Sequence, residues 1–291
     1  MSAAGLEAAR ELAAPGDTDA VTFAWADATE ELYGIARLGR GAAADGSPQG
    51  SALAILFAGR SPVGVLVRGG EALPDAGWER LALPGLETAV DVPLERWTVS
   101  GEGGATFRLS FEAAGPPDEL GAPAARAAGL TAYAQLCRVH GSVRVAGRER
   151  PVNGVGQRSH GWGNPDWDGI ELTRSLGIWF ADGTGVLAGA VRPAGAQSHA
   201  EETTCASLVG RGGSLAVAEA RLSTTTDGGG RQRRAGLELW LDEEQSPHRA
   251  AGELLCGSTL DLGALRLDCA FLRWHMEGRE GVGRYEVLRR A

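Results

Sequence analysis

The sequence contains no lysine: all 28 of its basic residues are arginine, in a chain of 291 residues. We attribute the absence of lysine to codon bias. The absence excludes mechanisms in which a lysine forms a Schiff base or acts as general base. The arginines face 37 acidic residues, which leaves a net charge of −9. Because a nucleic-acid binder needs a basic face to neutralise phosphates, we expect no nucleic-acid partner.

Long apolar stretches are also missing. The longest, residues 52–58, is far shorter than the ~20 residues that span a bilayer, so we expect no membrane span. Residues 1–16 include Glu7, Arg10 and Glu11 and have no apolar core, which argues against a signal peptide. We therefore interpret residues 1–20 as a tail or short helix and expect a cytoplasmic protein.

Metal-binding patterns are absent as well. None of the four cysteines has CxxC spacing, which disfavours a zinc or thioredoxin-type site, and free thiols are favoured over a bridge between Cys256 and Cys269. The run His-Ala-Glu-Glu places only His199 and Glu201 on one face of a strand, fewer ligands than a zinc site needs. We expect no metal and no cofactor.

Short strand-like segments dominate the rest of the chain. Within residues 106–112, Phe107, Leu109 and Phe111 alternate with polar residues, the period of a strand that is buried on one face. Asp182-Gly183 lies between two further apolar segments and predicts a hairpin turn. Comparable segments occur at residues 21–26, 52–58, 63–68, 88–92, 141–146, 177–181, 185–191, 214–222, 236–241, 252–258, 264–274 and 284–288. Regular short strands with frequent turns predict an all-β barrel or sandwich fold.

One segment interrupts the strand pattern. Residues 113–129 are rich in alanine, proline and glycine and have no period of two, so we interpret them as a linker. The predicted organisation is a first barrel at 21–112 and a second at 130–291. Each part holds enough strands to enclose one small ligand.

The sequence G-V-G-Q-R-S-H-G-W-G-N-P-D-W at residues 154–167 is the densest group of unusual residues. Its four glycines are expected to permit bulges or a close approach between strands. The G-x-G pair precedes no helical pattern, which argues against a dinucleotide site.

With this motif the chain resembles the lipocalin-like proteins of the carotenoid 1,2-hydratase (hydroxyneurosporene synthase) and AttH-like group, and within it actinobacterial members of unknown function. Further matches lie at Trp25 and at residues 33–39, 133–135, 137–145, 179–183 and 199–202. The resemblance implies two consecutive lipocalin-like (calycin) β-barrels. Relatives include a carotenoid hydratase and fungal proteins that promote intramolecular cycloadditions.

The motif departs from the group's pattern at three positions, where Ser159, Gly161 and Pro165 replace aspartate, serine and arginine. An aspartate next to His160 would stabilise the charged imidazole and fix its tautomer. Ser159 supplies no charge, which argues against a hydratase-like mechanism built on an Asp–His pair.

Two residues are candidates for catalysis. His160 is suited to exchange a proton with a double bond, as hydration or isomerisation requires, and Asp166 is the second candidate. The alternative is a histidine that is hydrogen-bonded between Trp162 and Trp167 at a contact between the barrels. Arg158 is the charge to which Asp166 is expected to pair across a turn, since buried charges need partners.

The candidate ligand-binding residues combine aromatic and polar side chains. They are Trp162, Trp167, Trp179, Tyr133, Gln135 and Arg158. Indoles line apolar cavities and orient ligands through their N–H groups, although each is equally compatible with a core position. Tyr133 and Gln135 share one face of a strand that we assign to the second barrel.

Three functional hypotheses follow. The first is a protein that encloses a lipophilic small molecule (a terpenoid, polyketide or steroid-like compound) and catalyses its cofactor-free hydration, isomerisation or cyclisation. The second is a non-catalytic carrier or chaperone of such a ligand. The third is a structural relative whose cavity is filled by side chains. The oligomeric state is left open.

Overall fold

The computed structural model describes residues 3–119, 122–241 and 246–291. Two residues of the predicted N-terminal segment (1–2) and two of the predicted linker (120–121) lie outside this range. The chain forms two compact units: unit 1 comprises the residues up to Pro117 with Tyr133–Pro165, and unit 2 comprises Asp118–Ala132 with Asp166–Ala291. Each unit is built on one curled, barrel-like antiparallel sheet, so the predicted all-β fold is confirmed.

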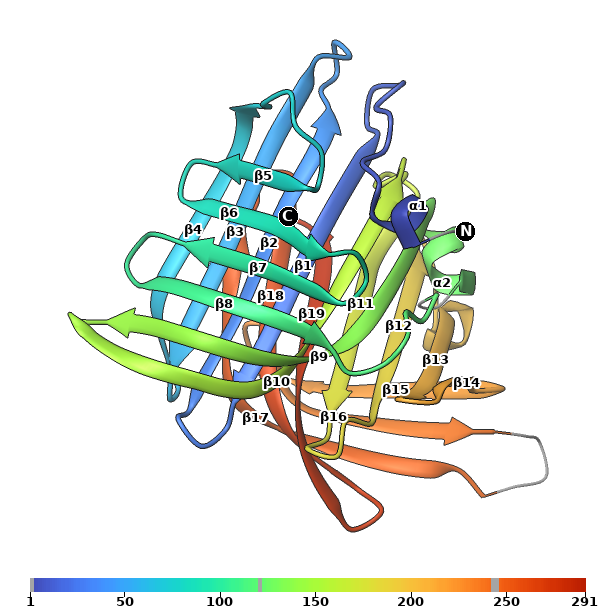
Figure 1. Ribbon diagram of the computed structural model, residues 1–291. Coiled ribbons are helices and arrows are strands. Elements are labelled where there is room, and N and C mark those ends of the chain that lie inside the picture. Colours follow the sequence, from blue (N-terminus) through green and yellow to red (C-terminus); the bar gives the residue numbers. More distant parts are fainter. Residues whose placement is uncertain (1–2, 120–121, 242–245) are drawn as a thin grey trace. The chain divides into compact units, whose positions relative to one another are not determined.

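Unit 1 contains a ten-stranded sheet in the order β4-β3-β2-β1-β10-β9-β8-β7-β6-β5. Its elements are α1 (Ala3–Glu7), β1 (Thr18–Asp27), β2 (Leu32–Ala42), β3 (Pro48–Ala58), β4 (Ser61–Ala72), β5 (Arg80–Leu83), β6 (Leu86–Val92), β7 (Arg96–Gly101), β8 (Thr106–Ala113), β9 (Leu130–Val145) and β10 (Arg148–Gly163). The sheet folds over itself, so that β5 to β8 cross β2 to β4 (Figure 1) and β6 packs against β2 and β3.

The strand that carries the glycine-rich motif joins the two halves of this sheet. Residues 155–163 of β10 pair with residues 18–26 of β1, with Val21 opposite His160. A Cβ atom on Gly154 or Gly156 would lie 2.2 Å from the carbonyl oxygen of Ala26 or Ala24, respectively. These two glycines therefore permit the close strand approach that the sequence predicted.

This pairing changes the expected division of the chain. The sequence placed residues 130–163 in the second barrel, but β9 pairs with β8 and β10 pairs with β1, so both strands belong to the first sheet. The Ala- and Pro-rich segment contributes the short helix α2 (Ala122–Ala127) to unit 2, where it packs against β12 and β13. Hydrogen bonding to an unpaired strand edge, which composition does not reveal, decides the assignment.

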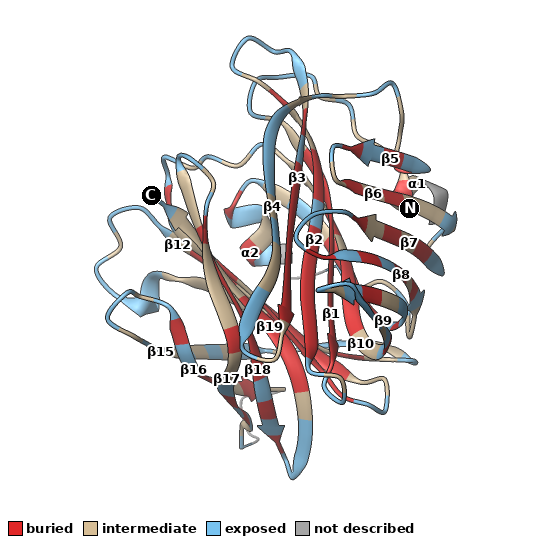
Figure 2. Ribbon diagram, turned by 90° about the vertical axis from the view of Figure 1, so that its left-hand side faces the viewer, coloured by how far each residue is buried: buried red, intermediate tan, exposed pale blue. Residues whose placement is uncertain are grey.

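The interior of unit 1 is filled by apolar side chains from both halves of the sheet. Phe107, Leu109 and Phe111 are buried and alternate with more exposed neighbours in β8, which confirms the predicted period of two. Figure 2 shows that buried residues run along β1, β2 and β3, whereas β4 is largely exposed. Trp25 from β1 belongs to this core, and the centre of its ring lies 5.3 Å from the ring centre of Phe107.

Unit 2 contains a nine-stranded sheet in the order β14-β13-β12-β11-β19-β18-β17-β16-β15. Its strands are β11 (Ile170–Trp179), β12 (Gly185–Pro193), β13 (Thr203–Gly210), β14 (Gly213–Ala216), β15 (Glu219–Thr226), β16 (Gln232–Trp240), β17 (His248–Asp261), β18 (Leu265–Met276) and β19 (Arg279–Arg290), with a short 3₁₀ helix η1 (His199–Glu201). Asp182 and Gly183 lie in the predicted hairpin turn between β11 and β12, and Gly183 has the positive φ of 84° that such a turn requires. Among the described residues, none of the helices is long and apolar enough to cross a membrane.

We predict that Gly34→Val destabilises the protein, because a Cβ at Gly34 would lie 2.2 Å from the buried indole ring of Trp25. Overpacking of a filled core costs about 1–3 kcal/mol, and urea unfolding measures the change. Gly69→Val is the matched control, since nothing lies within 4 Å of its added Cβ. Equal unfolding midpoints for the two variants would contradict the role assigned to Gly34.

Candidate functional site

Five of the eight sequence-predicted site residues lie together in unit 1. Arg158, His160 and Trp162 alternate along β10, and Tyr133 and Gln135 lie on β9. The rings of Tyr133 and Trp162 are centred 5.8 Å and 5.0 Å from the imidazole of His160. The sequence assigned Tyr133 and Gln135 to the second barrel, and the pairing of β9 with β8 corrects this.

His160 is completely buried and hydrogen-bonded through both ring nitrogens. Nε2 lies 2.6 Å from Oδ1 of Asp19 on β1, and Nδ1 lies 3.0 Å from the carbonyl oxygen of Leu6 in α1. Asp19 thus provides the carboxylate that Ser159 cannot supply. The argument against an Asp–His pair was wrong, because the aspartate comes from the neighbouring strand rather than from the motif.

Asp19 has several other donors around it. Its Oδ2 accepts hydrogen bonds from Nε1 of Trp78, a guanidinium nitrogen of Arg40 and the backbone N–H of Arg10, all at 2.9 to 3.0 Å. Burial raises the pKa of this carboxyl, but the hydrogen bond from His160, the Arg10 N–H, the charge of His160 and the Trp78 N–H together hold its pKa below the ordinary value. Asp19 is therefore an anion at neutral pH.

These partners define the protonation state of His160. The carbonyl oxygen of Leu6 only accepts hydrogen bonds, so Nδ1 must carry a proton. Because ionised Asp19 also only accepts, Nε2 must carry a proton too. The geometry is therefore that of a buried imidazolium paired with a carboxylate, which has a proton to donate and no lone pair to accept one.

Arg158 forms a second buried ion pair. One terminal nitrogen lies 2.5 Å from Oε2 of Glu7 at the end of α1, and the other lies 2.5 Å from the hydroxyl oxygen of Tyr133. The guanidinium also stacks 4.6 Å from the ring centre of Trp97. Burial raises the pKa of Tyr133 to about 12, so its hydroxyl stays protonated. We call Glu7, Asp19, Tyr133, Arg158 and His160 the polar cluster.

The other three predicted residues belong to unit 2. Asp166 is exposed, and its Oδ1 accepts hydrogen bonds from the backbone N–H groups of Asp168 and Gly169. The expected Arg158–Asp166 pair was wrong, because Glu7 holds the guanidinium instead. Trp167 packs on the apolar cluster around α2, and Trp179 is buried at the end of β11.

Sequence reasoning missed the two carboxylates of the polar cluster. Asp19 begins the alternating series Asp19, Val21, Phe23, Trp25, and a charge on an otherwise apolar face was a signal that such a residue has a buried partner. Glu7 lies in an alanine-rich run that gives no such signal. Its contact with Arg158 joins residues 151 positions apart.

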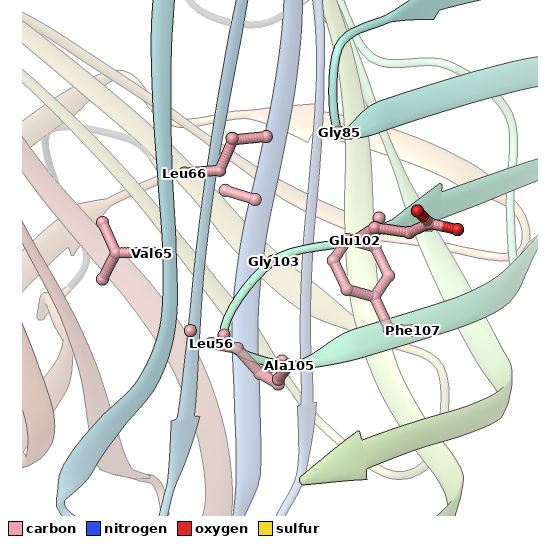
Figure 3. Close-up of a pocket in the computed structure, with 12 residues that line it drawn as sticks. Leu56, Val65, Leu66, Gly85, Glu102, Gly103, Ala105 and Phe107 are labelled. Carbon is pink, nitrogen blue, oxygen red and sulfur yellow. The ribbon is translucent and has the colours of Figure 1, made fainter.

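Two pockets lie elsewhere in unit 1. The first is an apolar crevice between β4 and the β7–β8 turn, where Figure 3 shows Leu66, Glu102 and Phe107 around the opening. Its free volume of about 20 Å³ accommodates a water molecule but no organic ligand. The second is a polar groove of about 750 Å³ over β5 to β10, lined by side chains that include Glu87, Arg108 and Arg144. His160 lines neither.

The described residues also include cysteines and possible metal ligands. The four cysteines have free thiols, and burial raises the pKa of Cys137 and Cys269 to about 12, so neither forms a thiolate nucleophile at neutral pH. Residues 3–119, 122–241 and 246–291 contain no group of three or more histidine, cysteine or acidic side chains placed to hold a metal ion.

Comparison with known proteins identifies relatives of the whole chain. The family model described as domain of unknown function (DUF7064) matches residues 7–291. An AttH-type protein from Nitrosomonas europaea is similar in structure, with a TM-score of 0.69 at 14% identity over 94% of this chain and 92% of the other. No curated protein matches the sequence.

Two further solved structures share the fold. Kievitone hydratase from Nectria haematococca has a TM-score of 0.67 at 11% identity, over 95% of this chain and 90% of the other. CghA, solved with Sch210972, has a TM-score of 0.65 at 12% identity, over 95% and 89% of the two chains. At these identities the likeness shows the fold alone.

We predict that Asp19→Asn destabilises the protein by about 3–5 kcal/mol at neutral pH, because it leaves a buried imidazolium without its counter-charge. Folding lowers the pKa of Asp19 from 3.8. The stabilisation that Asp19 contributes is therefore complete at pH values above 3.8, and it is lost as the pH falls through the lower pKa of the folded protein. Unfolding free energies of wild type and Asp19→Asn should therefore converge below that pH. The exposed Asp75→Asn is the control, and a constant difference at all pH values would contradict the assignment.

Proposed function

Because the chain belongs to the DUF7064 family, whose members are domains of unknown function, we propose its function from its own site: the protein binds a lipophilic small molecule in unit 1 and acts on it as a hydratase or cyclase. The ligand classes that fit the aromatic surroundings are terpenoids, polyketides and steroid-like compounds. No cofactor is part of the proposal. A specific relation to carotenoid 1,2-hydratases, an actinobacterial origin and a cytoplasmic location stay predictions.

One observation carries the proposal. Two proteins that share this fold over at least 89% of their own length are a hydratase and a protein solved with the organic compound Sch210972. The polar cluster adds the local support, since it gathers a proton donor, an arginine and a tyrosine hydroxyl among the indoles of Trp78, Trp97 and Trp162. Apolar walls with a few convergent polar groups are typical of small-molecule sites.

The protonation state of His160 decides which chemistry it can perform. As an imidazolium it donates a proton to one carbon of a double bond, and the resulting cation is captured by water in a hydration or by a second double bond in a cyclisation. A proton that is lost from the bound water or from a neighbouring carbon then restores the acid. Such a step requires the α1 segment to move, because the carbonyl oxygen of Leu6 now occupies Nδ1. Asp166 stays a predicted second proton carrier.

A carrier without turnover is the second candidate, and a specific observation favours it. His160 has no exposed surface, and both of its nitrogens are bonded to the protein itself. A group so fully paired is well suited to hold β1, β10 and α1 together. In that case the polar cluster maintains the end of the barrel, while apolar side chains alone contact the ligand.

We predict that lipophilic ligands quench the fluorescence of Trp162, which borders the polar cluster. A panel of terpenoid, polyketide and steroid-like compounds is titrated against wild type, Trp162→Phe and Trp240→Phe. Quenching should be reduced in Trp162→Phe and retained in Trp240→Phe, because Trp240 lies in unit 2 under Arg221. Identical titration curves for the two variants, or no quenching by any compound, would count against a ligand site in unit 1.

Turnover distinguishes the enzyme from the carrier. For a compound that binds, His160→Gln should lower the rate of conversion by roughly 10²–10⁴-fold, the usual contribution of a general acid. Ser159→Ala is the matched control, because adjacent side chains in a strand point to opposite faces. Binding without product in the wild type would support the carrier. Unchanged turnover in His160→Gln would remove His160 from the chemistry.

A further inference from the structure

We infer that the carboxylate of Glu7 occupies a binding pocket for an organic acid, and that a lipophilic carboxylate is the ligand that replaces it. The inference deepens the proposed function and rests on it, because it names the chemical class of the ligand. The pocket consists of Leu94, Trp97, Tyr133, Gln135 and Arg158. Its present occupant is a side chain of the protein's own N-terminal segment.

Glu7 is bound as a free carboxylate would be. Its Oε1 accepts hydrogen bonds from the backbone N–H of Leu94 at 3.1 Å and from Nε1 of Trp97 at 3.0 Å. Its Oε2 faces a terminal nitrogen of Arg158. Both oxygens of the carboxylate are thus satisfied by donors from three different strands or turns of unit 1. Backbone N–H groups, indole N–H groups and arginine are the donors with which proteins recognise carboxylate ligands.

The pocket has hydrogen-bonding capacity that Glu7 does not use. Nε of Arg158 has no hydrogen-bond partner in the protein. Because Arg158 is only 1% exposed, bulk water does not reach this nitrogen either. Oε1 of Gln135 is also buried without a partner; as an acceptor it can pair with a hydroxyl group of a ligand but not with its carboxylate. Buried polar atoms without partners are rare in folded proteins and carry a cost. An untethered carboxylate is free to engage the guanidinium through two nitrogens, which the tethered Glu7 does not do.

The segment that delivers Glu7 is held by individual contacts and not by strand pairing. α1 has only five residues, and residues 8–17 between it and β1 belong to no strand. A helix of one turn has little stability of its own, so its position depends on side-chain contacts.

The Glu7 carboxylate contacts Arg158, the Leu6 carbonyl accepts from His160, and the Arg10 N–H donates to Asp19. The guanidinium of Arg10 also stacks 4.0 Å from the ring centre of Trp162, and Arg40 donates to the carbonyl oxygen of Arg10. A ligand that displaces the segment must replace these contacts.

The same contacts indicate what the ligand looks like. Displacement of the segment exposes the guanidinium of Arg158. It also removes the carbonyl oxygen of Leu6 from Nδ1 of His160, so that this N–H becomes available to a ligand. The matching ligand has a carboxylate and a second acceptor oxygen, such as a carbonyl or hydroxyl. The indoles of Trp97 and Trp162 beside these groups suit an apolar or unsaturated body.

The first test is chemical rescue in the full-length chain. Glu7→Ala leaves Arg158 buried without a counter-charge, so its unfolding temperature should fall. Propionate near a hundred times its Kd should raise that temperature by roughly 5–10 °C, while propionamide should have no effect. The rescue should be absent in wild type, in the exposed control Glu11→Ala and in Glu7→Ala/Arg158→Met. No rescue of a folded Glu7→Ala by any small carboxylate would overturn the inference.

The second test uses the wild type, and it applies even where Glu7→Ala does not fold. Dodecanoate should increase amide hydrogen exchange in residues 3–17 several-fold, whereas dodecanol should leave it unchanged. Exchange that stays the same with dodecanoate would overturn the inference. The two hypotheses can fail separately. If neutral lipophilic compounds bind but carboxylates have no effect, only the acid pocket is contradicted. Rescue by propionate without binding of any lipophilic compound contradicts only the lipophilic ligand.

Discussion

The buried pair of Asp19 and His160 is the interaction on which unit 1 depends. Asp19 lies near the start of β1 and His160 near the end of β10, and both side chains are fully buried. A charge in that position is tolerated only when an opposite charge and hydrogen bonds surround it. Arg40, Trp78 and the backbone of Arg10 complete this environment. The pair therefore holds β1 and β10, the first and last strands of unit 1 along the chain, in register at the middle of the sheet.

The glycines of the motif serve the same closure. Gly154 and Gly156 allow β10 to approach the carbonyl groups of β1, and the larger residues that follow, Arg158 and His160, then point into the same interior. Apolar side chains fill the middle of the barrel, while the polar groups gather at one end beneath α1. Because the polar groups are separate from the apolar core, the unit has a candidate site although its core is packed. That site is the polar cluster, which only the short helix α1 and the residues after it cover.

The polar cluster has two possible uses, and both follow from the same contacts. As long as α1 is in place, Glu7 and Leu6 satisfy Arg158 and His160, and the cluster stabilises the fold. Once α1 moves, the cluster offers a cation and a proton donor to a ligand. The difference between the two uses lies in the N-terminal segment rather than in the barrel.

The sequence by itself determined the fold class and the strand with the site. Alternation in residues 106–112, the Asp182-Gly183 turn and the motif around His160 all report local constraints, because period and turn conformation depend on neighbours along the chain. Only the tertiary structure decided the partners. Asp19 lies 141 residues from His160 and Glu7 lies 151 from Arg158, and the assignment of β9 and β10 to unit 1 depends on which strand edges they pair with. A buried charge reveals in the sequence that it needs a partner, but the folded sheet selects which residue that partner is.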